Sequence, residues 1–296
     1  MFEGFSDERI TLASGLTLRV RAAGDGPSVL LLHGYPQTHA CWHLVAPRLV
    51  AAGFRVVASD LRGYGGSDKP ASAAPHETYS KRTMAADQVE LMQRLGHPRF
   101  HLAGHDRGGR VAHRLALDHP QAVARMAVLD IAPTATMYAR TERVFATGYY
   151  HWFFLIQPAP LPERLIGADP DFYLESKLAA WGRSGMEAYA PEVLEDYRQA
   201  FRDPACIAAT CEDYRAAATI DLDHDAADAE ARISSPLLAL WGARGLVGRL
   251  YDVPAVWAEK ARDVRGKALD CGHFLPEEAP EETAAALIGF FGAGAD

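Results

Sequence analysis

Lysine is rare in this sequence: five lysines stand against 25 arginines among its 30 basic residues. The 38 acidic residues outnumber the basic ones, the formal net charge is -8, and no basic stripe or lysine-rich tail is present. Binding to nucleic acid or to an anionic membrane needs a clustered positive field. The sequence therefore predicts neither as a partner. Its acidic balance, taken alone, also argues against an anionic substrate.

Cysteine is also scarce, with four residues in 296 and no CxxC pair or zinc-ligand spacing. The first residues are acidic, and no apolar run approaches the roughly 20 residues that span a bilayer. We therefore expect no signal peptide, no membrane segment and free thiols in a reducing cytoplasm. Two histidine pairs are spaced i, i+4 (His39 with His43, His101 with His105), but no third ligand is patterned nearby. No metal site is predicted.

The chain is long enough for one large core, and its hydrophobic content of 49% agrees with that. Short apolar runs alternate with helical patterns in the first half, which predicts a parallel sheet with helices on both faces. The predicted strands are residues 17–21, 28–33, 54–59, 100–104, 125–130, 236–241 and 267–270, and the predicted helices are 39–52, 80–95, 107–119 and 280–291.

The alternation stops after residue 133, and residues 134–218 are helical and aromatic with no convincing strand. We therefore expect an α/β core domain of residues 1–133 and 219–296 and an inserted helical cap domain of residues 134–218. An insertion at this point is well placed to cover the carboxyl ends of the strands, where ligands bind in open α/β sheets.

The most informative string surrounds Asp106. An apolar strand runs into G-x-D-x-G, with glycines at 104 and 108, and a helix follows. This order is the context of a nucleophile elbow, whose central residue is usually serine. A carboxylate that attacks a carbonyl forms only an anhydride, whereas attack on an sp3 carbon forms an alkyl ester that water can hydrolyse. The sequence therefore favours displacement of halide or opening of an epoxide over ester or peptide cleavage. The alternative is an ordinary N-cap aspartate.

Backbone donors for this chemistry are predicted at two turns. His33-Gly34-Tyr35-Pro36 follows an apolar strand, where this kind of fold places half of its oxyanion hole. The expected donors are the N–H groups of Tyr35 and Arg107. Sequence alone leaves open whether the bond before Pro36 is cis or trans.

The general base is expected late in the chain, after the last strand, and His273 in Gly-His-Phe is the candidate. The acid that orients the histidine often follows a strand that reads W-G-x-x-D, but Gly245 occupies that position here. We therefore assign the role to Asp130, which ends the preceding strand, with Asp252 as a weaker alternative. For Asp130 the competing interpretation is a turn or N-cap aspartate.

Arg107 and Arg110 are spaced i, i+3 at the start of the helix that carries Asp106, so they share one face near it. Two guanidinium groups beside one carboxylate exceed what charge balance requires. A substrate carboxylate would use the remaining donors. The alternative for either residue is a surface arginine paired with an acidic side chain.

Five strings together carry a family resemblance: H-G-Y-P-Q-T, D-L-R-G-Y-G-x-S, G-H-D-R-G-G-R, L-D-I-A-P-T and Y-Y-H-W-F-F-L. With them, the whole chain resembles the fluoroacetate dehalogenases of the α/β-hydrolase fold. Epoxide hydrolases and haloalkane dehalogenases share the aspartate nucleophile but typically have tryptophan after it, where this chain has Arg107.

The resemblance implies that fluoroacetate or a similar 2-haloacid binds to Arg107 and Arg110 through its carboxylate. It further implies that His151, Trp152 and Tyr214 donate N–H and O–H groups to the departing halide, with no metal or organic cofactor, and that the protein is a homodimer. Fluoride is a strongly hydrated anion, so a site that releases it needs several preorganised donors.

Three matters stay open at this point. Tyr149 is a further candidate for the pocket wall, because residues 149–154 are too aromatic for a solvated helix. An epoxide hydrolase with the same nucleophile, or a dehalogenase that prefers chloroacetate or longer 2-haloacids, would share most of these features. A ligand-binding protein that has lost its activity is the alternative from a different class.

Overall fold

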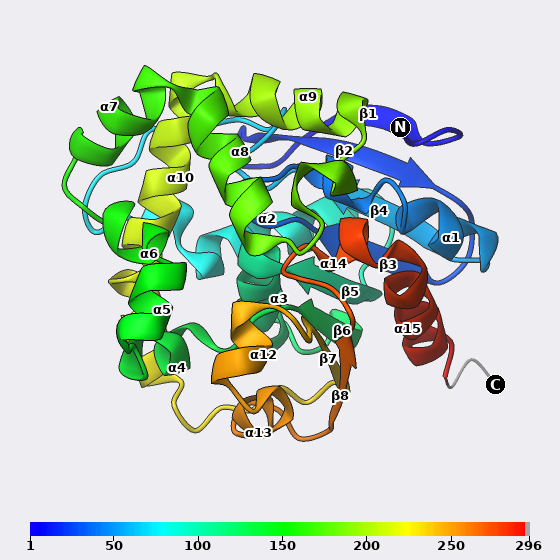
Figure 1. The fold of residues 1–296 in the computed structure, drawn as a ribbon. Helices are drawn as coiled ribbons and strands as arrows, with labels where there is room; N and C mark the ends of the chain where they lie inside the picture. The colour runs from blue at the N-terminus through cyan, green and yellow to red at the C-terminus, as the bar shows by residue number, and fades with distance from the viewer. Residues whose placement is uncertain (294–296) are drawn as a thin grey trace.

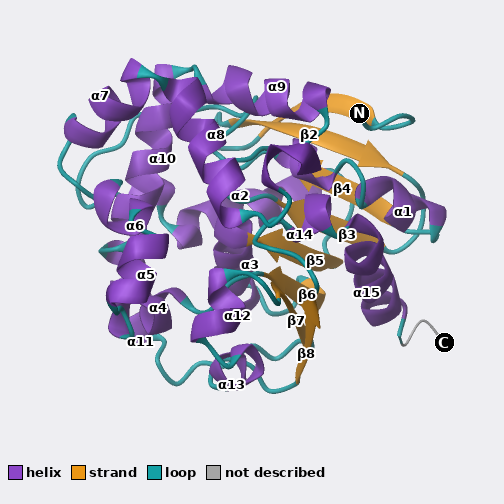
Figure 2. Cartoon of the chain, in the orientation of Figure 1, coloured by secondary structure: helices purple, strands orange, loops and turns teal. Residues whose placement is uncertain are grey.

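The computed structural model describes residues 1–293, and an eight-stranded sheet runs through its centre between two layers of helices (Figures 1 and 2). The strand order is β1-β2-β4-β3-β5-β6-β7-β8. The strands from β4 to β8 pair in parallel, while β1 and β2 pair antiparallel at one edge. The predicted fold class, a mostly parallel α/β sheet with an inserted helical region, is confirmed. The strands are β1 (Ser6–Thr11), β2 (Thr17–Ala23), β3 (Ser28–Leu32), β4 (Arg55–Ser59), β5 (Phe100–His105), β6 (Val123–Leu129), β7 (Leu237–Gly242) and β8 (Val264–Leu269).

The core helices that cover the sheet also contact one another in pairs: α1 contacts α15, and α2 contacts α3. The central strand β3 is buried along its whole length, as expected of a parallel strand covered on both faces. The core helices are η1 (His39–Trp42), α1 (Ala46–Ala51), η2 (Glu77–Tyr79), α2 (Lys81–Arg94), α3 (Asp106–Asp118), α12 (Leu246–Leu250), α13 (Val253–Ala258), α14 (Leu275–Glu278) and α15 (Pro280–Gly292).

Between β6 and β7 the chain forms the inserted helices, which occupy the left-hand side and the top of the molecule in Figure 1. Two of them begin at an aspartate N-cap followed by proline: Asp169 caps α8 and Asp203 caps α10. The helices of this insertion are α4 (Thr134–Ala139), α5 (Arg143–Gly148), α6 (His151–Phe154), α7 (Leu161–Ala168), α8 (Pro170–Trp181), η3 (Gly185–Ala188), α9 (Pro191–Phe201), α10 (Pro204–Ala217) and α11 (Ile220–Ala227).

Three elements differ from the sequence-based expectation. Strand β1 was not expected, because as an edge strand it alternates half-buried and exposed positions and reads as polar. The helix expected over residues 39–52 is two pieces, η1 and α1, and Pro47 lies in the first turn of the second. Strand β8 begins earlier than expected, since its residues 265–268 are exposed and give no apolar run.

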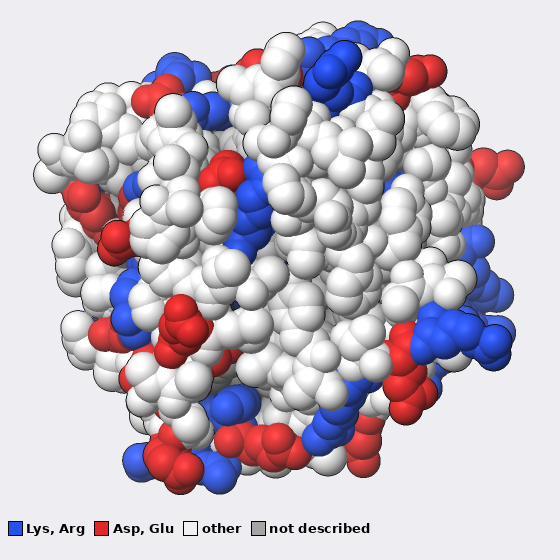
Figure 3. Space-filling model, turned by 90° about the vertical axis from the view of Figure 1, so that its left-hand side faces the viewer, with Lys and Arg blue, Asp and Glu red and all other residues white. Residues whose placement is uncertain are grey.

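The surface carries both signs of charge. On the face shown in Figure 3, acidic and basic side chains are interspersed around a largely uncharged centre. Within residues 1–293, no helix has the length and apolar character needed to cross a membrane.

The close approach of α3 to strands β3 and β5 requires glycine. A Cβ at Gly108 would lie 2.5 Å from the carbonyl oxygens of Leu32 and His33, and one at Gly104 would lie 2.4 Å from the carbonyl oxygen of Gly108. These contacts are with backbone atoms, which cannot rotate away. The two glycines therefore allow the first turn of α3 to sit directly on the sheet.

We expect Gly108→Ala to lower the free energy of unfolding by about 1–3 kcal/mol, because the added methyl group forces the backbone apart. Chemical denaturation with Gly167→Ala as the control measures this. At Gly167, on α7, an added Cβ meets nothing within 4 Å. The control should be neutral or slightly stabilising. Equal stability of the two variants would contradict the close-approach argument.

Candidate active site

Asp106 occupies the turn between β5 and α3 with a positive φ of 45°, a conformation that side chains other than glycine rarely adopt. The residue is 7% exposed. Oδ1 accepts a hydrogen bond of 2.9 Å from the backbone N–H of Tyr35, and Oδ2 lies 4.0 Å from Nε2 of His273. The peptide bond between Tyr35 and Pro36 is cis. One carboxylate oxygen of Asp106 is thus held by the backbone, and the other faces the histidine.

His273 and Asp130 form a close pair in the site. Nδ1 of His273 lies 2.6 Å from Oδ2 of Asp130, and Oδ1 of Asp130 accepts from the backbone N–H of Gly242 at 3.0 Å. Asp252 is elsewhere, where it caps α13 through the N–H of Ala255. Of the two carboxylates considered from sequence, Asp130 is therefore the one within hydrogen-bond distance of the histidine.

The charges in the site act on one another. Burial raises the pKa of the Asp106 carboxyl, but the neighbouring His273 and Arg110 outweigh burial and hold that pKa below its usual value. Burial lowers the pKa of His273, but the hydrogen bond and charge of Asp130, together with the charge of Asp106, raise it above its usual value. Asp106 is therefore ionised over the physiological range.

Arg107 is fully buried and already paired with Asp213 on α10, a contact that the charge-balance argument from sequence omitted. Its Nε and Nη2 lie 2.9 and 2.7 Å from the two carboxylate oxygens of Asp213. Lys81 and Tyr64 also bind this carboxylate. Only Nη1 of Arg107 is without a partner among the described residues. The positive charge available from Arg107 is thus smaller than expected.

Arg110 is buried beside the start of the inserted helices. Its Nη1 donates to the carbonyl of Ala132 at 3.1 Å and to the hydroxyl of Thr134 at 2.9 Å, while Nε has no partner among residues 1–293. The guanidinium also lies 4.6 Å from the centre of the Trp152 ring. Each arginine therefore keeps one guanidinium nitrogen without a protein partner among the described residues.

Three aromatic side chains of the insertion gather over these groups. The ring of Tyr214 lies 5.5 Å from that of His151 and 6.3 Å from that of Trp152. In the described chain, Nδ1 of His151 and the hydroxyl of Tyr214 are buried without a hydrogen-bond partner. Burial holds the pKa of His151 well below its usual value and raises that of Tyr214 well above its own. Both groups are therefore neutral and keep their protons as donors.

Sequence reasoning missed residues that lie next to this set. Asp213 directly precedes Tyr214, yet nothing in its local pattern showed that it faces Arg107. Trp181 ends α8, and its ring centre lies 4.3 Å from that of His151 and 5.9 Å from that of His273. Neither belongs to a recognisable motif, because both reach the site through the packing of the inserted helices.

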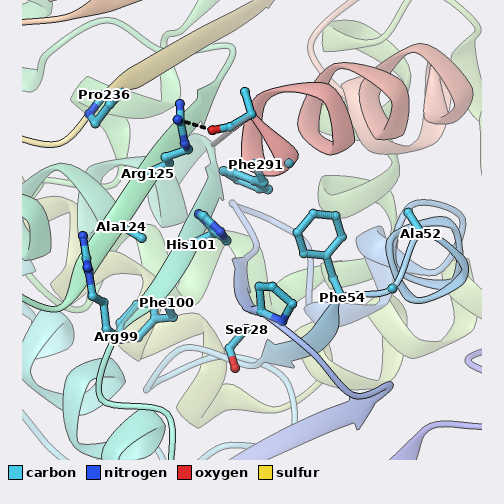
Figure 4. Close-up of a pocket in the computed structure, with 14 residues that line it drawn as sticks. Ser28, Ala52, Phe54, Arg99, Phe100, His101, Ala124, Arg125, Pro236 and Phe291 are labelled. Carbon is cyan, nitrogen blue, oxygen red and sulfur yellow. Dashed lines mark hydrogen bonds between the residues drawn. The ribbon is translucent and has the colours of Figure 1, made fainter. Parts of the chain in front are cut away.

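Other features of the described chain lie apart from Asp106. No three His, Cys, Asp or Glu side chains within residues 1–293 are grouped to hold a metal ion. A cavity of about 670 Å³ lies at the amino ends of the strands, opposite to Asp106, with Phe54, His101 and Arg125 among its walls (Figure 4). There Arg125 donates to the carbonyl of Ala293.

Comparison with known proteins identifies the fold family of this chain. Residues 27–280 match the family model described as the alpha/beta hydrolase fold. The chain is 48% identical to a fluoroacetate dehalogenase from Burkholderia sp over 290 residues, covering 98% of this chain and 95% of the relative. It is 32% identical to a soluble epoxide hydrolase from Corynebacterium sp. (strain C12) over 283 residues, covering 95% of each. A crystal structure from Nostoc sp PCC 7120, named as an alpha/beta hydrolase, superposes with a TM-score of 0.97 at 56% identity, covering 99% of this chain and 100% of that one. The chain belongs to the α/β-hydrolase fold family.

Proposed function

We propose that this protein is a hydrolytic dehalogenase of small 2-haloacids, which converts fluoroacetate and water to glycolate and fluoride through an ester on Asp106. The observation that carries the proposal is the set of groups that surround Asp106. An ionised carboxylate faces a histidine, while unpaired donors of Arg107, Arg110, His151 and Tyr214 are buried nearby. The 48% identity to a fluoroacetate dehalogenase supports the same substrate class.

In the first step, Oδ2 of Asp106 attacks the 2-carbon of the haloacid while the carbon–halogen bond breaks, and the halide carries away the bonding electrons. The substrate carboxylate binds Nη1 of Arg107 and Nε of Arg110, the two donors without protein partners. His151, Trp152 and Tyr214 solvate the leaving halide. Because the imidazole and phenol are neutral, they donate to an anion without binding it as a fixed counter-ion.

In the second step, water attacks the ester carbonyl and gives a proton to His273. The tetrahedral intermediate then collapses and its bond to the glycolate oxygen breaks. That oxygen takes the proton back from His273, and the Asp106 carboxyl releases its own proton to solvent. The N–H of Tyr35 already binds Oδ1 of Asp106, and the N–H of Arg107 is one of the free donors in the first turn of α3. Together they would hold the oxyanion. Esterification removes the charge of Asp106, and with it one of the causes that raise the pKa of His273. A larger fraction of His273 is therefore neutral, and so able to accept a proton from water, once the ester has formed.

One point distinguishes this proposal from epoxide hydrolysis, the reaction after which a relative at 32% identity is named. An epoxide carries no carboxylate and has no use for the free donors of Arg107 and Arg110. Release of halide from fluoro-, chloro- and bromoacetate, measured beside diol formation from a simple epoxide, separates the two reactions and ranks the acids.

The proposal also includes a cellular compartment, the cytoplasm, and an oligomeric state, the homodimer. All four cysteines, Cys41, Cys206, Cys211 and Cys271, are free and buried, which supports a reducing cytoplasm. The homodimer rests on the family resemblance, and sedimentation of the purified protein tests it.

Replacing His273→Asn is expected to stop turnover at the ester, because no base remains to activate water. Intact-mass analysis after mixing with chloroacetate should show one added carboxymethyl group, and peptide mapping should place it on Asp106. The matched control is His43→Asn, at a histidine whose side chain lies 3.1 Å from the carbonyl oxygen of Ala40, its one hydrogen-bond partner within residues 1–293. Turnover without any adduct in the His273 variant would rule out the ester route.

Arg110→Leu is expected to raise KM for haloacids by roughly 10- to 100-fold and to change kcat less, since a charge-assisted hydrogen bond is worth about 1.5–3 kcal/mol. The control is Arg140→Leu, at an arginine whose side chain is 54% exposed. Circular dichroism checks that the loss of the bonds to Ala132 and Thr134 leaves the fold intact. An unchanged KM would remove Arg110 from the carboxylate site.

The two steps should differ in their dependence on pH. Ester formation needs ionised Asp106, whose pKa is held below its usual value by His273 and Arg110, so this rate should be flat between about pH 5 and about pH 8. Ester hydrolysis needs neutral His273, so its rate should fall about tenfold per unit of pH below the pKa of that residue. Rapid-quench mass analysis of the unmodified enzyme should therefore find more ester at about pH 5 than at about pH 8. Equal amounts at both would contradict the assignment of the base.

A further inference from the structure

A second cavity, of about 250 Å³, lies at the seam between the inserted helices and the loop after β7. Tyr149, Ala180 and Trp181 line it from the insertion, and Arg244 and Arg249 line it from the core. We call it the seam cavity. It lies where the two parts of the chain meet without being joined by strand hydrogen bonds.

The seam cavity ends at the proposed active site. The hydroxyl of Tyr149 lies 3.4 Å from Nδ1 of His273, and the ring of Trp181 stands against His151 and His273. Both aromatic residues therefore have one side toward the cavity and another toward the catalytic groups. They form a wall one side chain thick.

The catalytic groups themselves have little contact with solvent. Asp106 is 7% exposed, His273 is 2% exposed, and Tyr214 is fully buried. A substrate must therefore pass through a part of the protein that opens. At the seam cavity, the side chains of Tyr149 and Trp181 stand between the cavity and the catalytic groups.

The charges around the seam cavity are unlike the charge of the whole chain. Its charged lining residues are all arginines: Arg183, Arg244 and Arg249. The Asp270 carboxylate is shared by Arg183 and Arg244, at 3.0 Å from each. Arg249 has no carboxylate within ion-pair distance in residues 1–293. Glu278, also on this seam, accepts from the backbone N–H groups of residues 183, 184 and 272.

We propose that the seam cavity is the vestibule through which a small carboxylate anion reaches Asp106, with Tyr149 and Trp181 as its movable inner wall. Three guanidinium groups against two carboxylates leave positive charge at the mouth, while the chain as a whole carries a net charge of -8. Local charge at a cleft raises the concentration and the arrival rate of a counter-ion. The identity of the anion rests on the proposed function, whereas the path itself does not.

The path is tested by narrowing the cavity. Ala180→Trp places an indole in its wall, while Ala179→Trp, one residue earlier on the same exposed end of α8, does not line it. We expect kcat/KM for chloroacetate to fall by about tenfold or more in the first variant only, and to become sensitive to solvent viscosity because passage then limits the rate. Identical kinetics of the two variants would overturn the vestibule.

The charge of the vestibule is tested separately with Arg249→Gln, and Arg140→Gln serves as the control at another exposed arginine. At low ionic strength the first variant should lose about two- to fivefold in kcat/KM for haloacid anions. The loss should vanish near about 0.5 M salt and should be absent for neutral haloacetamide, because only a screened charge interaction has been removed. A loss that is independent of salt would overturn the electrostatic part.

A readout without turnover separates this proposal from the proposed function. Exchange of ¹³C-labelled acetate with the protein, measured by nuclear magnetic resonance line broadening, should be slower in Ala180→Trp than in Ala179→Trp. That result supports the vestibule even where the unmodified protein releases no halide from any haloacid. Halide release together with equal acetate exchange in both variants leaves the proposed function standing and removes the vestibule.

Discussion

A carboxylate that must stay ionised where water is excluded is the constraint on which the rest of this site depends. Burial alone would protonate Asp106. The charges of His273 and Arg110 reverse that tendency, and the N–H of Tyr35 binds one of the carboxylate oxygens. Each comes from a different part of the chain, and each requires the strained turn after β5 that aims Asp106 at them. The close approach of backbone at Gly104 and Gly108 makes that turn possible.

The sequence predicts those parts of the structure whose conformation is determined by a short stretch of neighbouring residues. Apolar runs and turn residues predicted the strands that carry Asp106 and Asp130, and G-x-D-x-G predicted the elbow. The edge strand β1 was not predicted because half of its residues face solvent. The roles of Asp213 and Trp181 were not predicted for another reason. Their positions relative to Arg107 and His151 are set by how the inserted helices pack, which no short string of residues describes.

Arginine is favoured over lysine in this site because one guanidinium can serve two partners at once. Two of the nitrogens of Arg107 bind Asp213, which ties α3 to α10, and the third remains free. A lysine ammonium could neutralise the carboxylate but could not present a fixed, planar donor beyond it. Lys81, bound to the same Asp213, supplies charge alone. The pairing thus anchors the insertion to the core and orients the remaining donor of Arg107.

The position of the acid that orients His273 follows from the sheet. Strands β6 and β7 are parallel neighbours, so side chains that follow either strand reach the same point. Asp130 ends β6 and bonds to the N–H of Gly242, at the end of β7. A Cβ at position 245 would lie 3.3 Å from Oδ1 of Asp130, so a carboxylate there would bring two negative charges together. A carboxylate at position 245 would therefore raise the pKa of one of the two acids, and glycine at 245 avoids this conflict with Asp130.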